Sequence, residues 1–337
     1  MKELLQKKGI TLSPRVYFIT ALSYMALGLF SSLIIGLIMK TIGSQIAALS
    51  FFIPIGELAM SLMGPAIGVA VAYGLGAPPL VLFAAILAGA AGAELGGPAG
   101  SYAAALIAAE VGKLVSKSTK LDIIVTPLMT IFAGYGTATL IGPGIQSLLT
   151  NFGALIMWAT EQRPIIMGVI VAVLMGLALT APISSAAIAI MLGLEGIAAG
   201  AATIGCAAQM VGFAVSSYRE NGVGGFIAQG IGTSMLQVAN IVRNPWILVP
   251  PTVAGAILAP IGSGWLSLLN NPSGAGMGTS GFVGQIMTLN EMGTGGDIWI
   301  AILMLHFVGP AMISLLISEI MRRKGLIRPG DMKIQTD

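Results

Sequence analysis

The sequence predicts an all-α polytopic membrane protein that is embedded in a lipid bilayer through most of its length. Of its 337 residues, 56% are hydrophobic and only 9% are charged, whereas about a quarter of the residues of a soluble domain are charged. The mean hydropathy is +0.93. The charged residues separate long apolar segments, and a span of about 20 apolar residues each allows about ten transmembrane helices. We therefore expect residues 1–337 to form a single membrane-embedded unit without a soluble domain.

Basic residues divide the first half of the chain. They precede a first span that ends near Lys40, and they return in a loop at residues 113–120. Between these two places we expect apolar segments at about residues 46–73, 79–93 and 98–111. After the basic loop, a span follows at about residues 123–149.

Charged residues mark the loops of the second half in the same way. Glu161 and Arg163 open it, and Arg219 and Glu220 interrupt it. We expect apolar segments at about residues 164–180, 182–194, 197–216, 226–241, 246–269 and 298–320. A basic tail follows the last of these segments.

The distribution of basic residues predicts the orientation of the chain. Cytoplasmic loops carry an excess of Lys and Arg, which places both termini and the loop at residues 113–120 in the cytoplasm. Equal sides for the termini require an even number of crossings. We expect ten crossings, and a further segment at residues 273–289 is expected to be re-entrant.

Two clusters rich in Gly and Pro interrupt the apolar segments. One is Gly-Gly-Pro-Ala-Gly at residues 96–100, and the other runs from Asn270 to Gly278. Irregular backbone at membrane depth is tolerated where it is buried in protein or lines a cavity. Paired broken segments in two halves of a chain indicate a transporter site. Small residues that let helices pack closely are the alternative explanation.

Composition also excludes several classes of protein. The basic residues do not form the dense face that nucleic-acid binding requires, so no nucleic acid is expected as a partner. One Cys and one His cannot make a zinc cluster from these residue types, and Cys206 is expected to be a packing residue. No Walker sequence is present. We expect no cofactor, and the N-terminal 15 residues do not match a signal peptide.

Polar residues within apolar segments are the candidates for a binding site, because ionisable groups at membrane depth are costly. Glu94 lies between long apolar runs. Arg243 lies between two asparagines, and Glu291 follows the Gly-rich stretch. Arg243 beside Pro245 and Trp246 is equally well explained as an interfacial anchor. For His306 a structural role is favoured, and Asp297 is favoured as a residue of a helix N-terminus.

Neutral amides and hydroxyls accompany these charges, and they suit a polar, uncharged solute such as a sugar. An acidic solute remains an alternative, because the cation of Arg243 could bind its carboxylate. The residues predicted to line the site are Glu94, Asn240, Arg243, Asn244, Asn271, Thr279, Ser280 and Glu291.

Three stretches of the chain resemble the membrane component, enzyme IIC, of the bacterial phosphotransferase system. Residues 96–113 hold a Gly-rich turn, an Ala-rich helix and a basic loop, and residues 121–145 run from Thr-Pro-Leu to Ile-Gly-Pro. Residues 175–209 resemble the family's apolar helix, polar break and small-residue helix that ends in Ala-Ala-Gln. The resemblance is to the glucose-type superfamily, in the stand-alone branch that includes the perfringolysin regulator.

This resemblance implies a ten-span homodimer in the bacterial plasma membrane, with a scaffold part, a solute-carrying part and re-entrant hairpins. The protein would be a permease component and no enzyme itself, since phosphorylation of a sugar would need a separate cytoplasmic phosphocarrier protein. Two departures stand out. The family usually has a His near Thr180, and its Gly-Ile-Thr-Glu-Pro motif is matched here by Gly-Ile-Gly-Thr-Ser-Met at residues 230–235, without the Glu.

The sequence therefore predicts a membrane transporter of a small polar solute that is sugar-like. Two alternatives remain open at this point. A membrane sensor or regulator would bind the ligand without phosphotransfer, and an ion-coupled carrier would use the carboxylates within the membrane.

Overall fold

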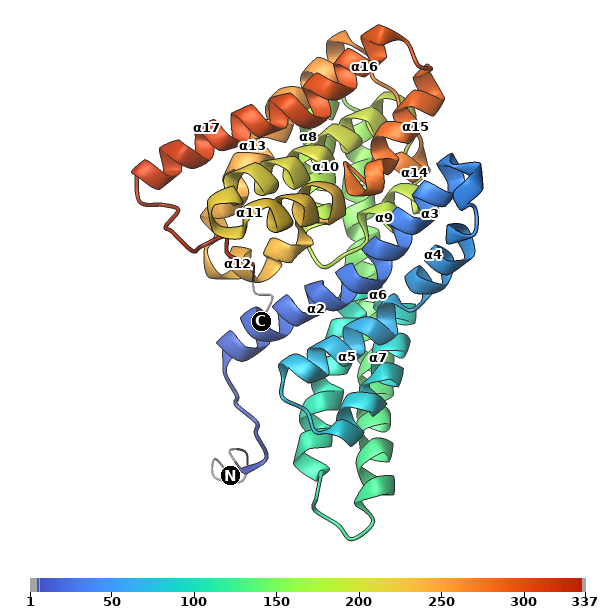
Figure 1. The fold of residues 1–337 in the computed structure, drawn as a ribbon, viewed down its shortest axis with the longest axis vertical. Coiled ribbons are helices and arrows are strands. Elements are labelled where there is room, and N and C mark those ends of the chain that lie inside the picture. The colour runs from blue at the N-terminus through green and yellow to red at the C-terminus, as the bar shows by residue number, and fades with distance from the viewer. Residues whose placement is uncertain (1–4, 6, 335–337) are drawn as a thin grey trace. The chain divides into compact units, whose positions relative to one another are not determined.

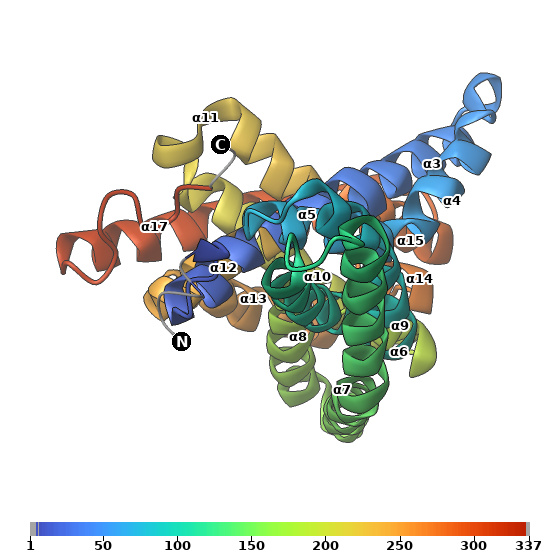
Figure 2. The same cartoon turned by 90° about the horizontal axis from the view of Figure 1, so that it is seen from below.

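The computed structural model describes residue 5 and residues 7–334, with the side chains of residues 187 and 191 excepted. Helices make up most of the described part, which contains no strand beyond one isolated bridge between Gly196 and Asn270. The predicted all-α class is therefore confirmed. The chain divides into two compact units, residues 1–148 and 149–335, here called unit 1 and unit 2. Figures 1 and 2 show their helices from two sides.

Unit 1 begins with a continuous apolar helical stretch, Val16–Gln45. Its elements are η1 (Val16–Ala21), α2 (Leu22–Leu29), η2 (Phe30–Ile34), α3 (Ile35–Gln45), η3 (Ala47–Leu49), α4 (Phe52–Ser61), α5 (Met63–Gly74), α6 (Pro79–Val115) and the first part of α7 (Asp122–Thr160). Helices α4 and α5 bend by 54° at the break between them. The predicted segment at residues 46–73 is thus one apolar stretch with a sharp bend.

Helix α6 folds back on itself at Gly96 and Gly97. Gly97 has φ 59°, ψ −149°, a conformation outside the helical region that glycine adopts without steric cost. Beyond the turn, the hydroxyl of Ser101 donates to the Gly89 carbonyl at 2.5 Å. A Cβ on Gly112 would meet the Val81 side chain at 2.7 Å. The two arms are therefore antiparallel, in agreement with the separate segments predicted at residues 79–93 and 98–111.

Small residues let the helices of unit 1 approach closely. A Cβ on Gly89 would meet the Cα of Gly68 at 2.7 Å. Gly134 of α7 sits in the same way against Ala88 and Ala108, one residue from each arm of the α6 hairpin. Between apolar helices in a membrane, such close packing replaces the hydrophobic effect as the source of association.

A buried ion pair closes the other end of the α6 hairpin. The Lys113 ammonium lies 3.1 Å from the Glu110 carboxylate and donates to the carbonyls of Gly9 and Leu75 at 3.0 and 2.9 Å. Lys8 bonds the Ser116 carbonyl from the same N-terminal segment. These contacts fix the segment before the first span against the basic loop.

Unit 2 is built around α10 (Gly196–Ser216), which is buried along most of its length. Before it come the last part of α7, α8 (Pro164–Thr180) and α9 (Ser185–Met191). After it come α11 (Tyr218–Ile227), η4 (Ala228–Gly232), η5 (Ser234–Gln237), α12 (Val238–Arg243), η6 (Pro245–Leu248), α13 (Val249–Pro260), η7 (Ile261–Trp265), α14 (Pro272–Ala275), η8 (Ser280–Phe282), α15 (Val283–Met292), α16 (Gly296–Ile302), η9 (Leu303–Val308) and α17 (Gly309–Arg323). Ala and Gly on α10 admit α8 and α13, and a Cβ on Gly205 would overlap the Ala172 backbone.

Six helices of the described residues are long and apolar enough to cross a membrane, or seven if α4 and α5 count as one span. This supports a multi-pass membrane protein. The predicted ten crossings and the re-entrant hairpins are not established by this measure, and they stay predictions.

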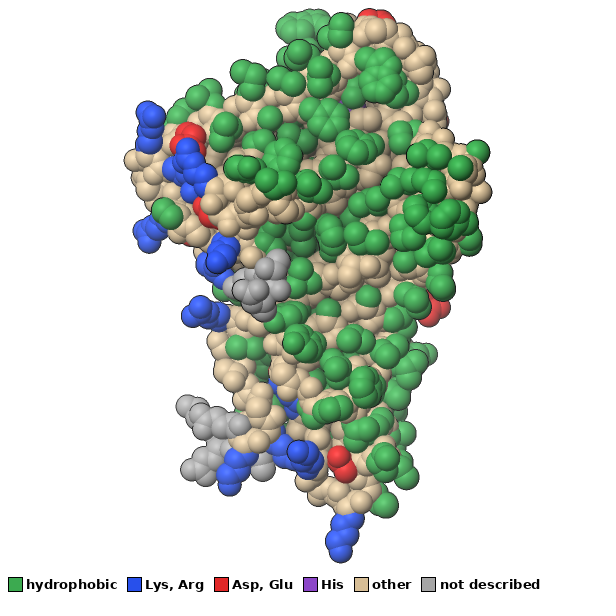
Figure 3. All heavy atoms as spheres, viewed as in Figure 1, with side chains coloured by type: hydrophobic (Ala, Val, Ile, Leu, Met, Phe, Trp, Pro, Cys, Tyr) green, Lys and Arg blue, Asp and Glu red, His purple; other side chains and the backbone are tan. Residues whose placement is uncertain are grey.

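Charged side chains gather at the ends of the helices. On the face in Figure 3, Lys and Arg side chains cluster near the end of α17 and around the loop between α6 and α7, while hydrophobic side chains are spread over the remaining surface. At the end of α17, Arg322 pairs with Glu220 at 2.9 Å and Arg219 pairs with Glu319 at 2.9 Å. Such a separation of charge from apolar surface is typical of a membrane-embedded bundle.

Candidate functional site

Two loops with the same five-residue pattern break the helices of unit 2. They are Gly-Ile-Gly-Thr-Ser at residues 230–234 and Gly-Met-Gly-Thr-Ser at residues 276–280, here called the first and second GxGTS loops. The hydroxyl of Thr279 in the second loop donates to the carbonyl of Gly230 in the first at 2.5 Å. The repeated pattern therefore marks two chain breaks that meet inside one unit.

The first GxGTS loop also contacts the end of α8. The hydroxyls of Thr180 and Ser234 lie 2.8 Å apart, and Thr180 lies 3.4 Å from the side-chain oxygen of Gln209. The Gln209 amide in turn donates to the Thr252 hydroxyl at 2.8 Å. Four helical elements thus supply a continuous row of donors and acceptors, and none of these side chains is charged.

The second GxGTS loop lies between α14 and α15, and Asn270 fixes this hairpin to α10. The Asn270 side chain is 1% exposed and donates to the hydroxyls of Thr203 and Thr288 at 2.7 and 3.1 Å. Asn270 was not among the residues predicted to line the site, although it opens the predicted Gly-rich break. Its role is to hold irregular backbone within the unit, where every polar group needs a partner.

Several predicted site residues lie on this hairpin. Asn271 caps α14 by accepting from the backbone of Ser273 and Gly274 at 3.1 and 3.2 Å, and it donates to the exposed Glu291 carboxylate at 3.0 Å. Thr279 and Ser280 are buried in the second GxGTS loop. The structure thus brings Asn271 and Glu291 together, as well as Thr279 and Ser280.

The remaining predicted residues lie elsewhere. Asn240 donates to the Lys333 carbonyl at 3.0 Å, and Asn244 donates to the Leu326 carbonyl at 2.9 Å and the Asp331 carboxylate at 2.7 Å. Both amides therefore hold the C-terminal segment. Arg243 is exposed at the end of α12, and Glu94 is exposed near the turn of α6 in unit 1.

Thr180, Ser234 and Gln209 were not predicted as site residues. Thr180 and residues 230–235 were noted only because the family's His and Glu are missing from this part of the sequence. Single hydroxyl side chains such as these do not stand out in the sequence, and their contact depends on the fold. The signal that could have found the first loop is its repetition 46 residues later, at residues 276–280.

The site offers hydrogen bonds rather than charge. Thr180 and Gln209 are 2% and 1% exposed, so their donors and acceptors lie away from water, where each hydrogen bond is stronger. Among residue 5 and residues 7–334, no group of three or more His, Cys, Asp and Glu side chains is placed to hold a metal ion. Cys206 is buried on α10, with its sulfur 3.4 Å from the Met175 carbonyl.

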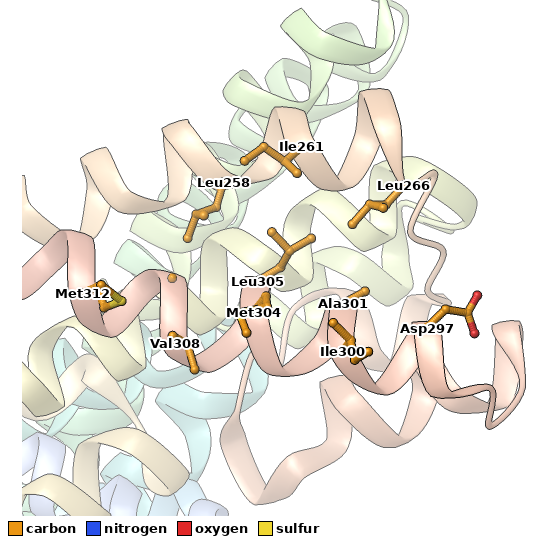
Figure 4. A pocket seen from close by; sticks show the side chains of 11 residues that line it. Leu258, Ile261, Leu266, Asp297, Ile300, Ala301, Met304, Leu305, Val308 and Met312 are labelled. Atoms are coloured by element: carbon orange, nitrogen blue, oxygen red, sulfur yellow. The ribbon is translucent and has the colours of Figure 1, made fainter.

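A separate groove runs along the outside of unit 2, between α13 and the last helical stretch (Figure 4). Its volume is about 410 Å³, and its lining includes Leu258, Ile261, Met304 and Leu305, with Asp297 at one end. Such a wall offers almost no hydrogen-bond donors or acceptors to a polar solute. The buried GxGTS loops are therefore the better candidate site.

Broken helices that carry buried polar loops, within a chain of apolar spans, are a feature of secondary transporters. The family model described as "Phosphotransferase system, EIIC" matches residues 19–334. The chain belongs to the enzyme IIC family of the phosphotransferase system. This confirms the predicted family and makes the protein a membrane-embedded permease of the phosphotransferase type. No curated protein and no solved structure matches the chain at a significant level.

Within this enzyme IIC protein, the two departures noted in the sequence lie on neighbouring elements. Thr180 lies near the place where the family usually has its His, and Ser234 belongs to the loop nearest to the family's Glu-containing motif. The hydroxyls of Thr180 and Ser234 are 2.8 Å apart, so the end of α8 and this loop are in contact.

Proposed function

We propose that this enzyme IIC protein transports a small, polar, uncharged solute with several hydroxyl groups, such as a sugar. The observation that supports this best is the meeting of the two GxGTS loops beside Thr180. The side chains there both donate and accept hydrogen bonds, as a hydroxyl-rich solute requires. A carboxylate solute would need a cation or a helix N-terminus in the same place.

The solute is held by unit 2 in this proposal. Its contacts are Thr180, Gln209, Ser234, Thr279 and Ser280. Transport by rigid-body motion of one part is common where the site lies between broken helices. Glu94, Asn240, Arg243, Asn244, Asn271 and Glu291 stay predictions as lining residues.

Phosphorylation of the solute is not a task for the residues at this site. The hydroxyls of Thr180 and Ser234 lack the basicity of an imidazole or a carboxylate at neutral pH. Any phosphotransfer would come from a separate cytoplasmic phosphocarrier protein. We further propose ten crossings with both termini in the cytoplasm of a bacterial cell, and a homodimer, which cross-linking in native membranes would test.

The solute is found first by a thermal-shift screen of the detergent-solubilised protein against sugars, sugar acids, carboxylates and nucleosides. A ligand of the folded state alone adds about 2.7 kcal/mol of stability at a hundredfold excess over its Kd. We expect hits among neutral sugars. Hits confined to acids would contradict the proposal.

Uptake of the best sugar into proteoliposomes then tests transport and its site. We expect Thr180→Ala and Ser234→Ala to lower uptake at least tenfold, while Ser263→Ala keeps it. Ser263 is a matched control, because its buried hydroxyl bonds only the Pro164 and Ala259 carbonyls at 2.8 and 2.9 Å. Binding without uptake would show a sensor in place of a transporter. Dependence of uptake on a proton or sodium gradient would show an ion-coupled carrier.

A further inference from the structure

Gln285 and His306 form a buried polar pair in unit 2. Gln285 lies on α15 and is 5% exposed, and His306 lies in η9 and is completely buried. The Gln285 amide nitrogen and His306 Nδ1 are 3.0 Å apart. The ring centroids of Phe282 and Phe307 are 6.3 Å apart, so the hairpin and η9 touch at two places.

Each member of this pair has an unused polar atom. The side-chain oxygen of Gln285 and Nε2 of His306 are buried and have no hydrogen-bond partner among the described residues. Buried polar groups are rarely left unpaired in native proteins, and the interior of a bilayer supplies no water to pair them. His306 also lies in a π-helical segment, and such interruptions of an α-helix are frequent at functional sites.

The chemistry of the missing partner follows from the pair itself. If the Gln285 amide nitrogen donates to Nδ1, a neutral ring carries its proton on Nε2, and the Gln285 oxygen is a free acceptor. If the amide is rotated by 180°, its oxygen accepts from Nδ1, the amide N–H is free, and Nε2 is the free acceptor. Both arrangements leave at least one donor and one acceptor unused.

We propose that Gln285 and His306 form a binding site for a neutral hydroxyl oxygen, which belongs either to the transported solute or to a resident water molecule. A hydroxyl both donates and accepts, so it matches the two unused atoms. A carboxylate only accepts, and an ammonium group only donates. If the hydroxyl belongs to the solute, the inference rests on the proposed transport function. If it belongs to a water molecule, the inference is independent of that function.

His306 is the only His of the chain, so protein labelled with 15N-histidine gives a single imidazole spectrum. In detergent micelles without sugar, a nuclear Overhauser contact between this ring and water identifies a resident water. Addition of D-glucose tests the solute: a saturable shift of the ring resonances that is lost in Gln285→Met identifies a solute hydroxyl. Gln162→Met is the control variant, because Gln162 lies in a loop and bonds only the Trp158 carbonyl.

Two results would overturn the site. One is the absence of both the water contact and the glucose-dependent shift in the parent protein. The other is a ring that carries protons on both nitrogens at neutral pH, since it would require an anion. Both are measured on the unaltered protein, so a poorly folded Gln285→Met variant does not obscure them. A water contact together with failed sugar uptake would keep this site and contradict the transport proposal alone.

Discussion

The hydroxyl of Thr180 lies 2.8 Å from the hydroxyl of Ser234, although 54 positions separate the two residues in the chain. Thr180 is the last residue of α8, and Ser234 follows the end of η4. Both stand where regular backbone hydrogen bonding stops, so their side chains act where the backbone leaves polar groups unpaired. The contact therefore couples two chain breaks and makes them one site.

This coupling predicts that Thr180→Ala and Ser234→Ala are not additive in stability. Each variant removes the same hydrogen bond, which contributes about 1 kcal/mol. In a double-mutant cycle measured by unfolding in detergent, we expect an interaction energy of about 1 kcal/mol. The pair Thr180→Ala and Ser263→Ala is the control, because Ser263 bonds the Pro164 carbonyl at the opposite end of α8. An additive cycle for Thr180 and Ser234 would show that the bond is absent in the folded protein.

The sequence was sufficient to predict the all-α class and several of the helices, because a bilayer constrains them strongly. Apolar length and the position of charges located α8 and α10 almost residue by residue, since lipid requires every backbone group to be paired within a helix. The turn of α6 was also predictable. Two glycines, Gly96 and Gly97, adopt non-helical backbone angles easily, and Pro98 disfavours a helix that continues through it.

The site was only partly predictable, for a physical reason. Polar residues at chain breaks were recognised at Asn271, Thr279 and Ser280 because such breaks are unusual in an apolar sequence. The contact of Thr180 with Ser234 depends on how α8 packs against the first GxGTS loop, and one sequence does not contain that geometry. His306 was expected to be a satisfied structural residue, and the structure leaves its Nε2 without a partner among the described residues.

Close helix packing in unit 1 predicts opposite effects of two Gly-to-Ala changes. In Gly89→Ala the new methyl would meet the Gly64 carbonyl and the Gly68 Cα, the latter at 2.7 Å. We expect a loss of about 1–3 kcal/mol from overpacking. In Gly136→Ala nothing lies within 4 Å of the new methyl, and a gain of up to about 1 kcal/mol in helix propensity is expected. Thermal unfolding in one detergent measures both, and equal effects would contradict the close approach of α5 to α6.

The ion pair of Glu110 and Lys113 predicts a large cost for Lys113→Met. The Lys113 side chain is 2% exposed, so its removal leaves a carboxylate without its partner, at a cost of about 3–5 kcal/mol. The variant should also free the N-terminal segment, because Lys113 holds the Gly9 carbonyl. Lys40→Met is the control, since the pair of Lys40 and Glu57 is 43% and 56% exposed and such pairs contribute little. Faster proteolysis near Gly9 in both variants would refute this role of Lys113.

The C-terminal segment predicts a local effect of Asn244→Ala. This change removes the bonds to the Leu326 carbonyl and the Asp331 carboxylate, while Ile327 and Met332 stay buried by packing. We expect faster proteolysis after Arg328 with little change in the unfolding temperature of unit 2. Asn290→Ala is the control, because Asn290 is exposed. If Asn244→Ala left the cleavage rate unchanged, packing alone would hold the segment.

The proposed topology predicts that Lys117 and Glu161 lie on opposite sides of the membrane. They flank α7, whose part in unit 1, residues 122–148, extends about 40 Å at 1.5 Å per residue, beyond a hydrocarbon core of about 30 Å. Cys206 is completely buried, and Cys206→Ala gives a background without other thiols. On this background we expect a membrane-impermeant maleimide to label Glu161→Cys in intact cells, and Lys117→Cys and Lys324→Cys only after lysis. Labelling of Lys117→Cys and Glu161→Cys from the same side would overturn the parity that gives ten crossings.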